Sequence, residues 1–212
     1  MAANRKIIDL RNLLAERFAQ PTASPASGQL TTGIGVLDKI GGLRKGSITE
    51  LISTRPSAGS ALLIHGLLHL AWRKRFFLAL VDGRDSFDVQ SMSPAGLAHL
   101  LWIRCETATE AIKGADLLLR DGNFPLVILD LILNAVEELR RIPATSWYRL
   151  QRLVEATPSA FLVMSRHNLV PSARLKLVLE NQWQLAHLER EESLSALHVR
   201  VRRSHVMASA HR

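Results

Sequence analysis

Several kinds of residue are scarce in this chain of 212 residues, and each scarcity excludes a class of protein. The single cysteine, Cys105, excludes an internal disulfide and favours a reducing compartment, so we expect a cytoplasmic protein. No apolar run reaches the roughly 18 uncharged residues needed to span a bilayer, and we expect no membrane partner. Residues 1–18 are charged throughout and lack the apolar centre of a secretory signal.

Acidic residues are scarce relative to basic ones. The chain holds 27 Lys and Arg against 19 Asp and Glu, which gives a net charge of +8. A basic chain favours an anionic partner such as nucleic acid, and a merely solvated basic surface is the alternative. Apolar residues make up 47% of the chain, which is enough to fill the core of one α/β domain and too many for a disordered protein.

Apolar runs alternate with helical patterns along most of the chain. Runs rich in apolar and β-branched residues, typical of buried strands, occur at residues 48–52, 76–82, 101–105, 125–131 and 160–165. Helical patterns occur at residues 61–75, 94–100, 107–121, 133–141 and 147–156. Two alternating runs, 183–188 and 197–201, with a turn at 189–193, predict a hairpin. We therefore expect an α/β fold with a mostly parallel central sheet, helices on both faces and an antiparallel edge hairpin at the C-terminus.

The sequence divides into three segments. Residues 1–20 predict an amphipathic helix whose apolar positions are Ile7, Leu10, Leu14 and Phe18. Residues 21–29 are small and polar and predict a linker, and residues 30–212 form the core with its basic C-terminal hairpin and tail. A helix on such a linker can fold back on its own domain or dock on another chain, and the apolar positions are candidates for partner binding.

A strand, a loop of small residues and a helix follow one another at residues 48–75, which is the layout of a phosphate-binding loop. The working pattern is G-x-x-x-x-G-K-[ST], in which Lys reaches the β- and γ-phosphates and a hydroxyl holds Mg²⁺. Here the first Gly is Thr54, the second survives as Gly59, the Lys is Ser60 and the hydroxyl residue is Ala61. We expect these four residues, with Asp130, to form a vestigial nucleotide site that has no catalytic residue and no metal.

Acidic residues follow two of the expected strands. Asp130 follows the apolar residues 126–129 within the run at 125–131, where a Walker B acid holds Mg²⁺ in ATPases of this layout. The alternative is an Asp at a strand end that caps the following helix. The position at which a carboxylate would polarise the attacking water is Arg84. Asp82, Asp85 and Asp88 lie nearby, and any of them could serve at a different offset; a plain charged loop is the favoured reading.

The tail and two histidines complete the set of candidates. Residues 196–212 contain no acid, and Arg200, Arg202 and Arg203 are candidates for contact with DNA phosphates or an acidic partner. Alternatively, their charge protects an edge strand from aggregation. His65 and His69 have a spacing used for zinc, but no third ligand suggests itself, so we expect surface histidines.

The block from residue 30 to residue 130 resembles the RecA/recombinase ATPase core. The resemblance rests on LTTGIGVLDKI-GGLRKGSITEL, the loop, VDGRDSFD and PLVILDL, and the tail continues it in outline. Within that superfamily the chain looks most like the ImuA group, through the degenerate loop and the segment LLWIRCETATEAIKGADLLLRDGNFPLVILDL. The stretches by which RecA grips DNA are short here and lack their glycines.

The resemblance implies a RecA-like fold and a role in the SOS response, in translesion synthesis after DNA damage. It implies three protein partners: an ImuB-like inactive Y-family polymerase, an error-prone DNA polymerase and RecA itself. It also implies a bacterial cytoplasmic protein that associates with the nucleoid when acting on DNA. Because the loop Lys, the metal hydroxyl and the catalytic Glu are all missing, we expect a non-catalytic accessory protein that needs no cofactor.

Two alternatives stay open. One is a RecA-family DNA repair ATPase that binds ATP through a shifted set of residues, with Lys74 or Arg55 in place of the missing Lys. The other is a DNA-binding protein that acts through its basic surface, with an affinity that falls steeply with salt.

Overall fold

A sheet of seven strands forms the centre of the computed structural model, which describes residues 28–55, 58–181 and 194–204. The strand order is β5-β4-β6-β7-β3-β8-β9. In chain order the strands are β3 (Ser47–Ser53), β4 (Leu78–Asp82), β5 (Leu100–Arg104), β6 (Leu126–Asp130), β7 (Ala160–Ser165), β8 (Leu175–Leu179) and β9 (Val199–Ser204). All neighbours pair in parallel except β8 and β9. The expected α/β fold with a mostly parallel sheet is confirmed.

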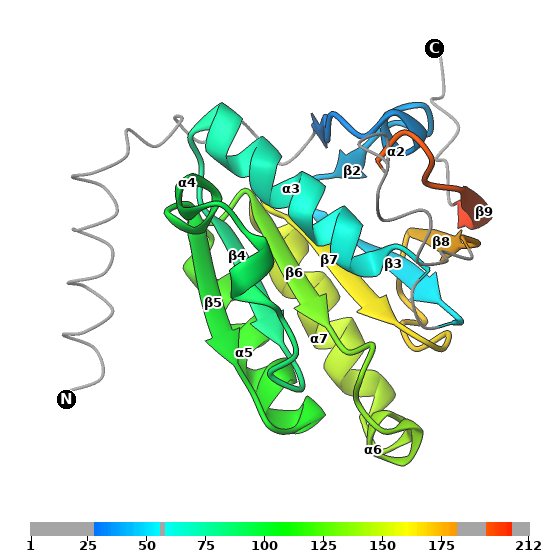
Figure 1. Cartoon of the computed structure of the whole chain (residues 1–212). Coiled ribbons are helices and arrows are strands. Elements are labelled where there is room, and N and C mark those ends of the chain that lie inside the picture. The colour runs from blue at the N-terminus through cyan, green and yellow to red at the C-terminus, as the bar shows by residue number, and fades with distance from the viewer. Residues whose placement is uncertain (1–27, 56–57, 182–193, 205–212) are drawn as a thin grey trace, which may run out of the picture.

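Helices cover both faces of the sheet (Figure 1). One face carries α2 (Gly35–Asp38), α3 (Ser60–Lys74) and α4 (Pro94–Leu97). The other carries α5 (Ala108–Asp121) and α7 (Ala144–Glu155), and α6 (Val136–Arg140) precedes α7. Each face has its own core cluster, so β4, β6 and β7 are buried on both sides. This explains why their sequences are continuous apolar runs with no alternation.

Local signals fix the ends of the helices. The Thr107 side chain accepts a hydrogen bond from the backbone N–H of Glu110 and caps α5, and Gly122 ends the helix with a left-handed φ of 70°. Helix α3 ends at Lys74 after Arg73, cations that suit the negative end of a helix dipole. Among the described helices, none is long and apolar enough to cross a membrane.

The antiparallel edge hairpin is present, but its first strand differs from the one expected. The last strand, β9, pairs with β8, whose residues 175–179 precede the expected run at 183–188. That run lies outside the described residues. Strand β8 also pairs with β3 in parallel, so the hairpin continues the central sheet. Lys176, the second of its five residues, interrupts the apolar pattern of β8.

Lys176 is buried in an ion pair with Glu50 of β3. Its Nζ atom lies 2.7 Å from Oε2 of Glu50, whose side chain is fully buried. Oε1 of Glu50 accepts hydrogen bonds from the backbone N–H groups of Leu169 and Val170. Lys176 in turn donates to the carbonyl of Val170. The pair thus joins β3 and β8 to the base of the loop that follows β7.

The N-terminal part of the described chain adds a small second sheet. Strand β1 (Gln29–Leu30) pairs antiparallel with β2 (Leu43–Arg44), so Gln29, the last residue of the expected linker, already belongs to this sheet. The expected helix at residues 1–20, with Ile7, Leu10, Leu14 and Phe18, lies outside the described residues.

Candidate functional site

The loop between β3 and α3 lies at the carboxyl edge of the sheet, where nucleotides bind in parallel α/β folds. Gly59 has φ 102° and ψ 12°, a left-handed conformation that a side chain would strain, and it directly precedes Ser60, the first residue of α3. The second Gly of the loop pattern therefore still provides the tight turn from the loop into α3. Residues 56–57 of the loop lie outside the described residues.

A pocket of about 410 Å³ lies beside this loop. Ser60 and Ala61 contribute to it from α3, together with Asp130 from the end of β6, so the structure brings together three of the five expected site residues. Thr54 is exposed on the loop, and Gly59 adjoins Ser60. The rest of the lining is mixed, with Arg55, His65, Ser86 and Asp88 among apolar side chains: Leu62, Ile64, Phe87, Met92, Ile132 and Leu133.

Asp130 is the most perturbed acid of the pocket. Its pKa is raised to about 6. Burial is the largest cause, the hydrogen bond from the backbone N–H of Ile132 opposes it, and the nearby carboxylate of Asp82 adds to it. An acid that held Mg²⁺ beside a Lys would be surrounded by positive charge, and its pKa would be low. The bond to Ile132 ties the carboxylate to the turn after β6, and helix α6 begins only at Val136, so Asp130 does not cap that helix.

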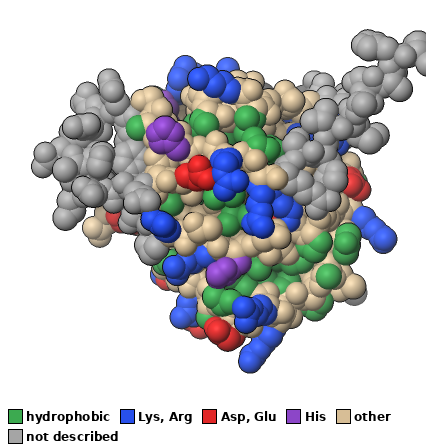
Figure 2. All heavy atoms as spheres, turned by 90° about the vertical axis from the view of Figure 1, so that its right-hand side faces the viewer, with side chains coloured by type: hydrophobic (Ala, Val, Ile, Leu, Met, Phe, Trp, Pro, Cys, Tyr) green, Lys and Arg blue, Asp and Glu red, His purple; other side chains and the backbone are tan. Residues whose placement is uncertain are grey.

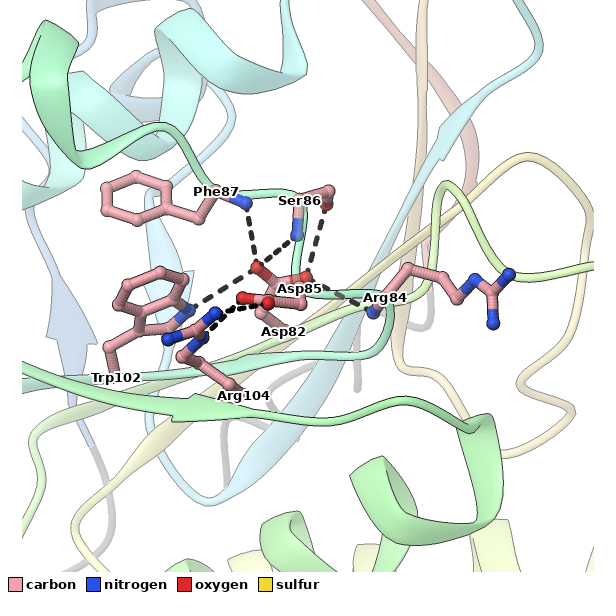
Figure 3. Close-up of polar contacts among 7 residues, drawn as sticks. All are labelled: Asp82, Arg84, Asp85, Ser86, Phe87, Trp102 and Arg104. Carbon is pink, nitrogen blue, oxygen red and sulfur yellow. Dashed lines mark hydrogen bonds and ion pairs between the residues drawn. The ribbon is translucent and has the colours of Figure 1, made fainter.

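Asp82 ends β4 and is buried in the turn that follows it (Figure 3). Its carboxylate accepts hydrogen bonds from the backbone N–H groups of Ser86 and Phe87, both at 2.7 Å, and from that of Arg84 at 3.2 Å. The Ser86 hydroxyl and the indole N–H of Trp102 add to these bonds. With its oxygens so occupied, Asp82 orders the turn and is not free to polarise a water molecule.

The other two acids after β4 are also engaged. Asp85 forms a bidentate ion pair with Arg104 of β5. Hydrogen bonds from that guanidinium hold the pKa of Asp85 below its usual value. Asp88 lines the pocket and caps the short 3₁₀ helix Val89–Ser91 through the N–H of Gln90.

Arg84, at the position expected for a catalytic carboxylate, turns away from Asp82 (Figure 3). Its Nη1 atom donates to the carbonyl oxygen of Glu106 at 3.0 Å. An arginine directed to a backbone carbonyl supplies no base for the activation of water.

The two cations proposed as substitutes for the loop Lys lie far apart. Arg55 lines the pocket from the loop itself. Lys74 is the last residue of α3, whereas the pocket lies at the first, about 20 Å away at 1.5 Å per residue. The structure therefore retains Arg55 as a candidate and removes Lys74.

Basic residues of the tail lie on the edge strand β9. Arg200 and Arg202 are exposed, and Arg200 pairs with Glu180 at 2.5 Å. Arg203 lies in β9 opposite Lys176, with its side chain outside the described part. Lys and Arg side chains gather on the side of the molecule that Figure 2 shows, with few acidic side chains among them.

Metal-binding side chains do not gather anywhere in the described chain in groups of three or more. His65 and His69 are exposed on α3, and His69 lies against Trp72, with 5.3 Å between ring centroids. Cys105 is buried as expected.

Sequence reasoning missed two contributors near the candidate site. Trp102 of β5 donates to Asp82 and packs edge-on against Phe87, with 5.6 Å between ring centroids. Glu50 supports the loop after β7 from inside the sheet. An acid within an otherwise apolar strand was the one signal in the sequence that pointed to Glu50, since such a residue needs a buried partner.

Comparison with known proteins gives partial similarity to RecA. No protein-family model matches the chain. It is 30% identical over 93 residues to RecA of Clavibacter michiganensis subsp. michiganensis, which is 43% of this chain and 25% of that protein. It is 28% identical over 119 residues to RecA of Rickettsia bellii and 24% identical over 119 residues to RecA of Mycobacteroides abscessus, in each case 55% of this chain and 34% of the relative.

The chain thus spans about a quarter to a third of the length of the curated relatives that it matches. The mostly parallel sheet with helices on both faces is consistent with the RecA fold. Taken together, the partial similarity and the fold support a RecA-like protein.

Proposed function

We propose that this protein is a non-catalytic, RecA-like accessory factor of bacterial error-prone DNA repair. It belongs with the ImuA group and acts in the cytoplasm during the SOS response. It binds protein partners and does not hydrolyse ATP. The partners are an ImuB-like inactive polymerase, an error-prone DNA polymerase and RecA.

The observation that carries this proposal is the electrostatic state of the pocket. Phosphoryl transfer depends on positive charge around the phosphates and on a carboxylate that orients the nucleophile. In this pocket Ser60 and Ala61 occupy the positions of the Lys and the metal ligand, and burial leaves Asp130 with a raised pKa. Removal of one such stabilising group typically costs about 10²–10³-fold in rate, and here three are missing.

An ATPase assay tests the absence of catalysis. We expect the purified protein to release no phosphate above background, with and without single-stranded DNA. The control is Asp130→Ala. Hydrolysis well above background that disappears in Asp130→Ala would overturn the proposal.

Mutagenesis in cells tests the accessory role. A strain that lacks the protein is expected to lose mutagenesis induced by DNA damage, and Asp130→Asn and Ser60→Ala are expected to restore it as well as the wild type does. A strain that mutates normally without the protein would refute the role. Pull-downs from damaged cells, with and without residues 1–20, identify the partners and show whether the N-terminal segment binds them.

The second candidate function is nucleotide binding without hydrolysis, and the position of Arg55 in the pocket favours it. A guanidinium can form two hydrogen bonds with a phosphate group without Lys or metal. Calorimetric titration with ATP distinguishes the two functions. Binding that Arg55→Ala removes supports this candidate, and the absence of heat supports the first.

A further inference from the structure

Helices α5 and α7 bound a groove of about 340 Å³ on the face of the molecule opposite α3. Its apolar lining consists of Ile112, Leu117 and Leu150. Leu150 is buried, but Leu117 is 63% exposed, the largest exposure among the large apolar residues that the structure describes. Ile112 is half-buried. Apolar side chains that stay exposed beside a groove indicate a site for a partner molecule.

The charges along the groove are predominantly positive. Lys113, one helical turn before Leu117, forms no ion pair with any residue that the structure describes. Asp116 is the only carboxylate in the lining, and it lies between two guanidinium groups, 2.6 Å from Nε of Arg149 and 2.7 Å from Nε of Arg120. Burial raises the pKa of Asp116, but the hydrogen bonds and charges of these two arginines outweigh burial and leave the pKa below its usual value. The carboxylate is therefore ionised, and its charge is balanced by the two guanidinium groups.

The remaining acids of the two helices lie toward the helix ends. Glu110 is in the first turn of α5 and accepts a hydrogen bond from the N–H of Glu106. Asp121 and Glu155 are the last residues of α5 and α7. The middle of the groove therefore combines an apolar floor with an excess of positive charge.

We propose that this α5–α7 groove binds a short segment of a partner protein in which an apolar side chain is flanked by Asp or Glu. The apolar side chain covers Leu117 and enters the groove beside Ile112. The flanking carboxylates approach Lys113 and the outer N–H groups of Arg149. This deepens the proposed function, on which it rests for the existence of a protein partner, because it states the chemistry of that partner.

Charge and shape argue against the other occupants. A nucleic-acid backbone satisfies the cations but leaves Leu117 in water, since phosphates and sugars offer little apolar surface. A second copy of the chain, related by a two-fold axis through the groove, would bring Lys113 and Arg149 against their own counterparts. An acidic and apolar peptide meets both requirements at once.

Selection from a displayed library of short random peptides tests the proposal on the full chain. Enriched peptides are expected to carry an apolar residue next to Asp or Glu. Their affinity, measured by fluorescence polarisation, is expected to fall at least tenfold in Leu117→Asp and in Lys113→Glu, and to weaken as salt is raised. Leu133→Asp is the matched control, because Leu133 is 61% exposed but lies in the pocket beside α3, and it is expected to bind like the wild type.

Several outcomes would overturn the proposal. One is a library that yields no enriched peptide, and another is a set of enriched peptides that lack Asp and Glu. A third is that the enriched peptides bind Leu117→Asp as tightly as they bind the wild type. Single-stranded DNA that displaces a groove-bound peptide from the wild type but does not bind Leu117→Asp would make this a nucleic-acid site. A dimer that Leu117→Asp dissociates, seen by sedimentation, would assign the groove to a second copy.

Urea denaturation of each variant separates a lost contact from a lost fold. The result is also separable from the proposed function. ATP hydrolysis by the protein would overturn that function without affecting peptide binding at the groove. A groove that binds no peptide would overturn this inference without affecting the ATPase result.

Discussion

Replacing Asp130 by Asn removes a half-buried carboxylate that lines the pocket at the end of β6. Burial raises its pKa from 3.8 to about 6. Its Oδ1 atom accepts a hydrogen bond of 3.0 Å from the N–H of Ile132, and the amide oxygen of Asn can accept the same bond. The substitution therefore changes the charge and little else.

The sign and size of the effect follow from linkage. Between about pH 4 and pH 6 the folded state keeps a proton on Asp130 that the unfolded chain has lost, so the free energy of unfolding falls as pH rises through this window. A shift of about two pKa units corresponds to about 3 kcal/mol at neutral pH, and relaxation around the carboxylate makes this an upper bound. Asp130→Asn is expected to match the wild type near pH 4 and to exceed it by about 1–3 kcal/mol at pH 7.

Urea denaturation of both proteins across this pH range measures the difference. Asp85→Asn serves as a control of opposite sign, because hydrogen bonds from Arg104 hold the pKa of Asp85 below 3.8. This variant should lose stability relative to the wild type as pH rises to about 4, and its difference from the wild type should stay nearly constant above that pH. A stability difference between Asp130→Asn and the wild type that stays constant from about pH 4 to pH 7 would refute the raised pKa of Asp130.

Two further predictions concern the scaffold of the site. Lys176→Met leaves Glu50 charged, buried and unpaired, and is expected to lower the free energy of unfolding by about 3–5 kcal/mol in urea denaturation, with recovery in the double variant Glu50→Gln/Lys176→Met. The exposed pair is the control: Arg200→Met, opposite Glu180, should cost less than about 1 kcal/mol. Gly59→Ala forces a side chain into φ 102° and is expected to cost about 1–3 kcal/mol in thermal denaturation, and an unchanged melting temperature would contradict this conformation of the loop.

Periodicity alone predicted most of the fold. Strands β4, β6 and β7 are continuous apolar runs because both of their faces are buried. Where such runs alternate with helical patterns along a chain, they indicate strands of a parallel sheet. Strand β8 was missed because a charge in a short apolar run normally indicates exposure. Only the position of Glu50, far away in the sequence, makes Lys176 compatible with a central strand.

The candidate site was less accessible to sequence reasoning. The spacing from the loop indicated the position of Asp130, which lines the pocket, and the loop pattern identified Gly59, which adopts the left-handed turn. The raised pKa of Asp130 could not be predicted, because desolvation depends on what packs around the carboxyl group. Likewise, the sequence could not distinguish Asp82, Asp85 and Asp88. The structure distinguishes them, because the backbone N–H groups of the turn after β4 donate to the carboxylate of Asp82. The assignments of the N-terminal helix and of Arg200, Arg202 and Arg203 to partner binding stay predictions.

The turn after β4 resembles an anion-binding site in which the protein supplies its own anion. Converging backbone N–H groups of this kind hold phosphate or sulfate in many proteins. Here the carboxylate of Asp82 takes the place of the bound ion, so no external anion can enter the turn without expelling it. The shape of the turn therefore depends on a negative charge encoded within the chain. Mutations that restore the Lys and the hydroxyl of the phosphate loop would leave this carboxylate engaged, and the water-activating group would have to come from elsewhere.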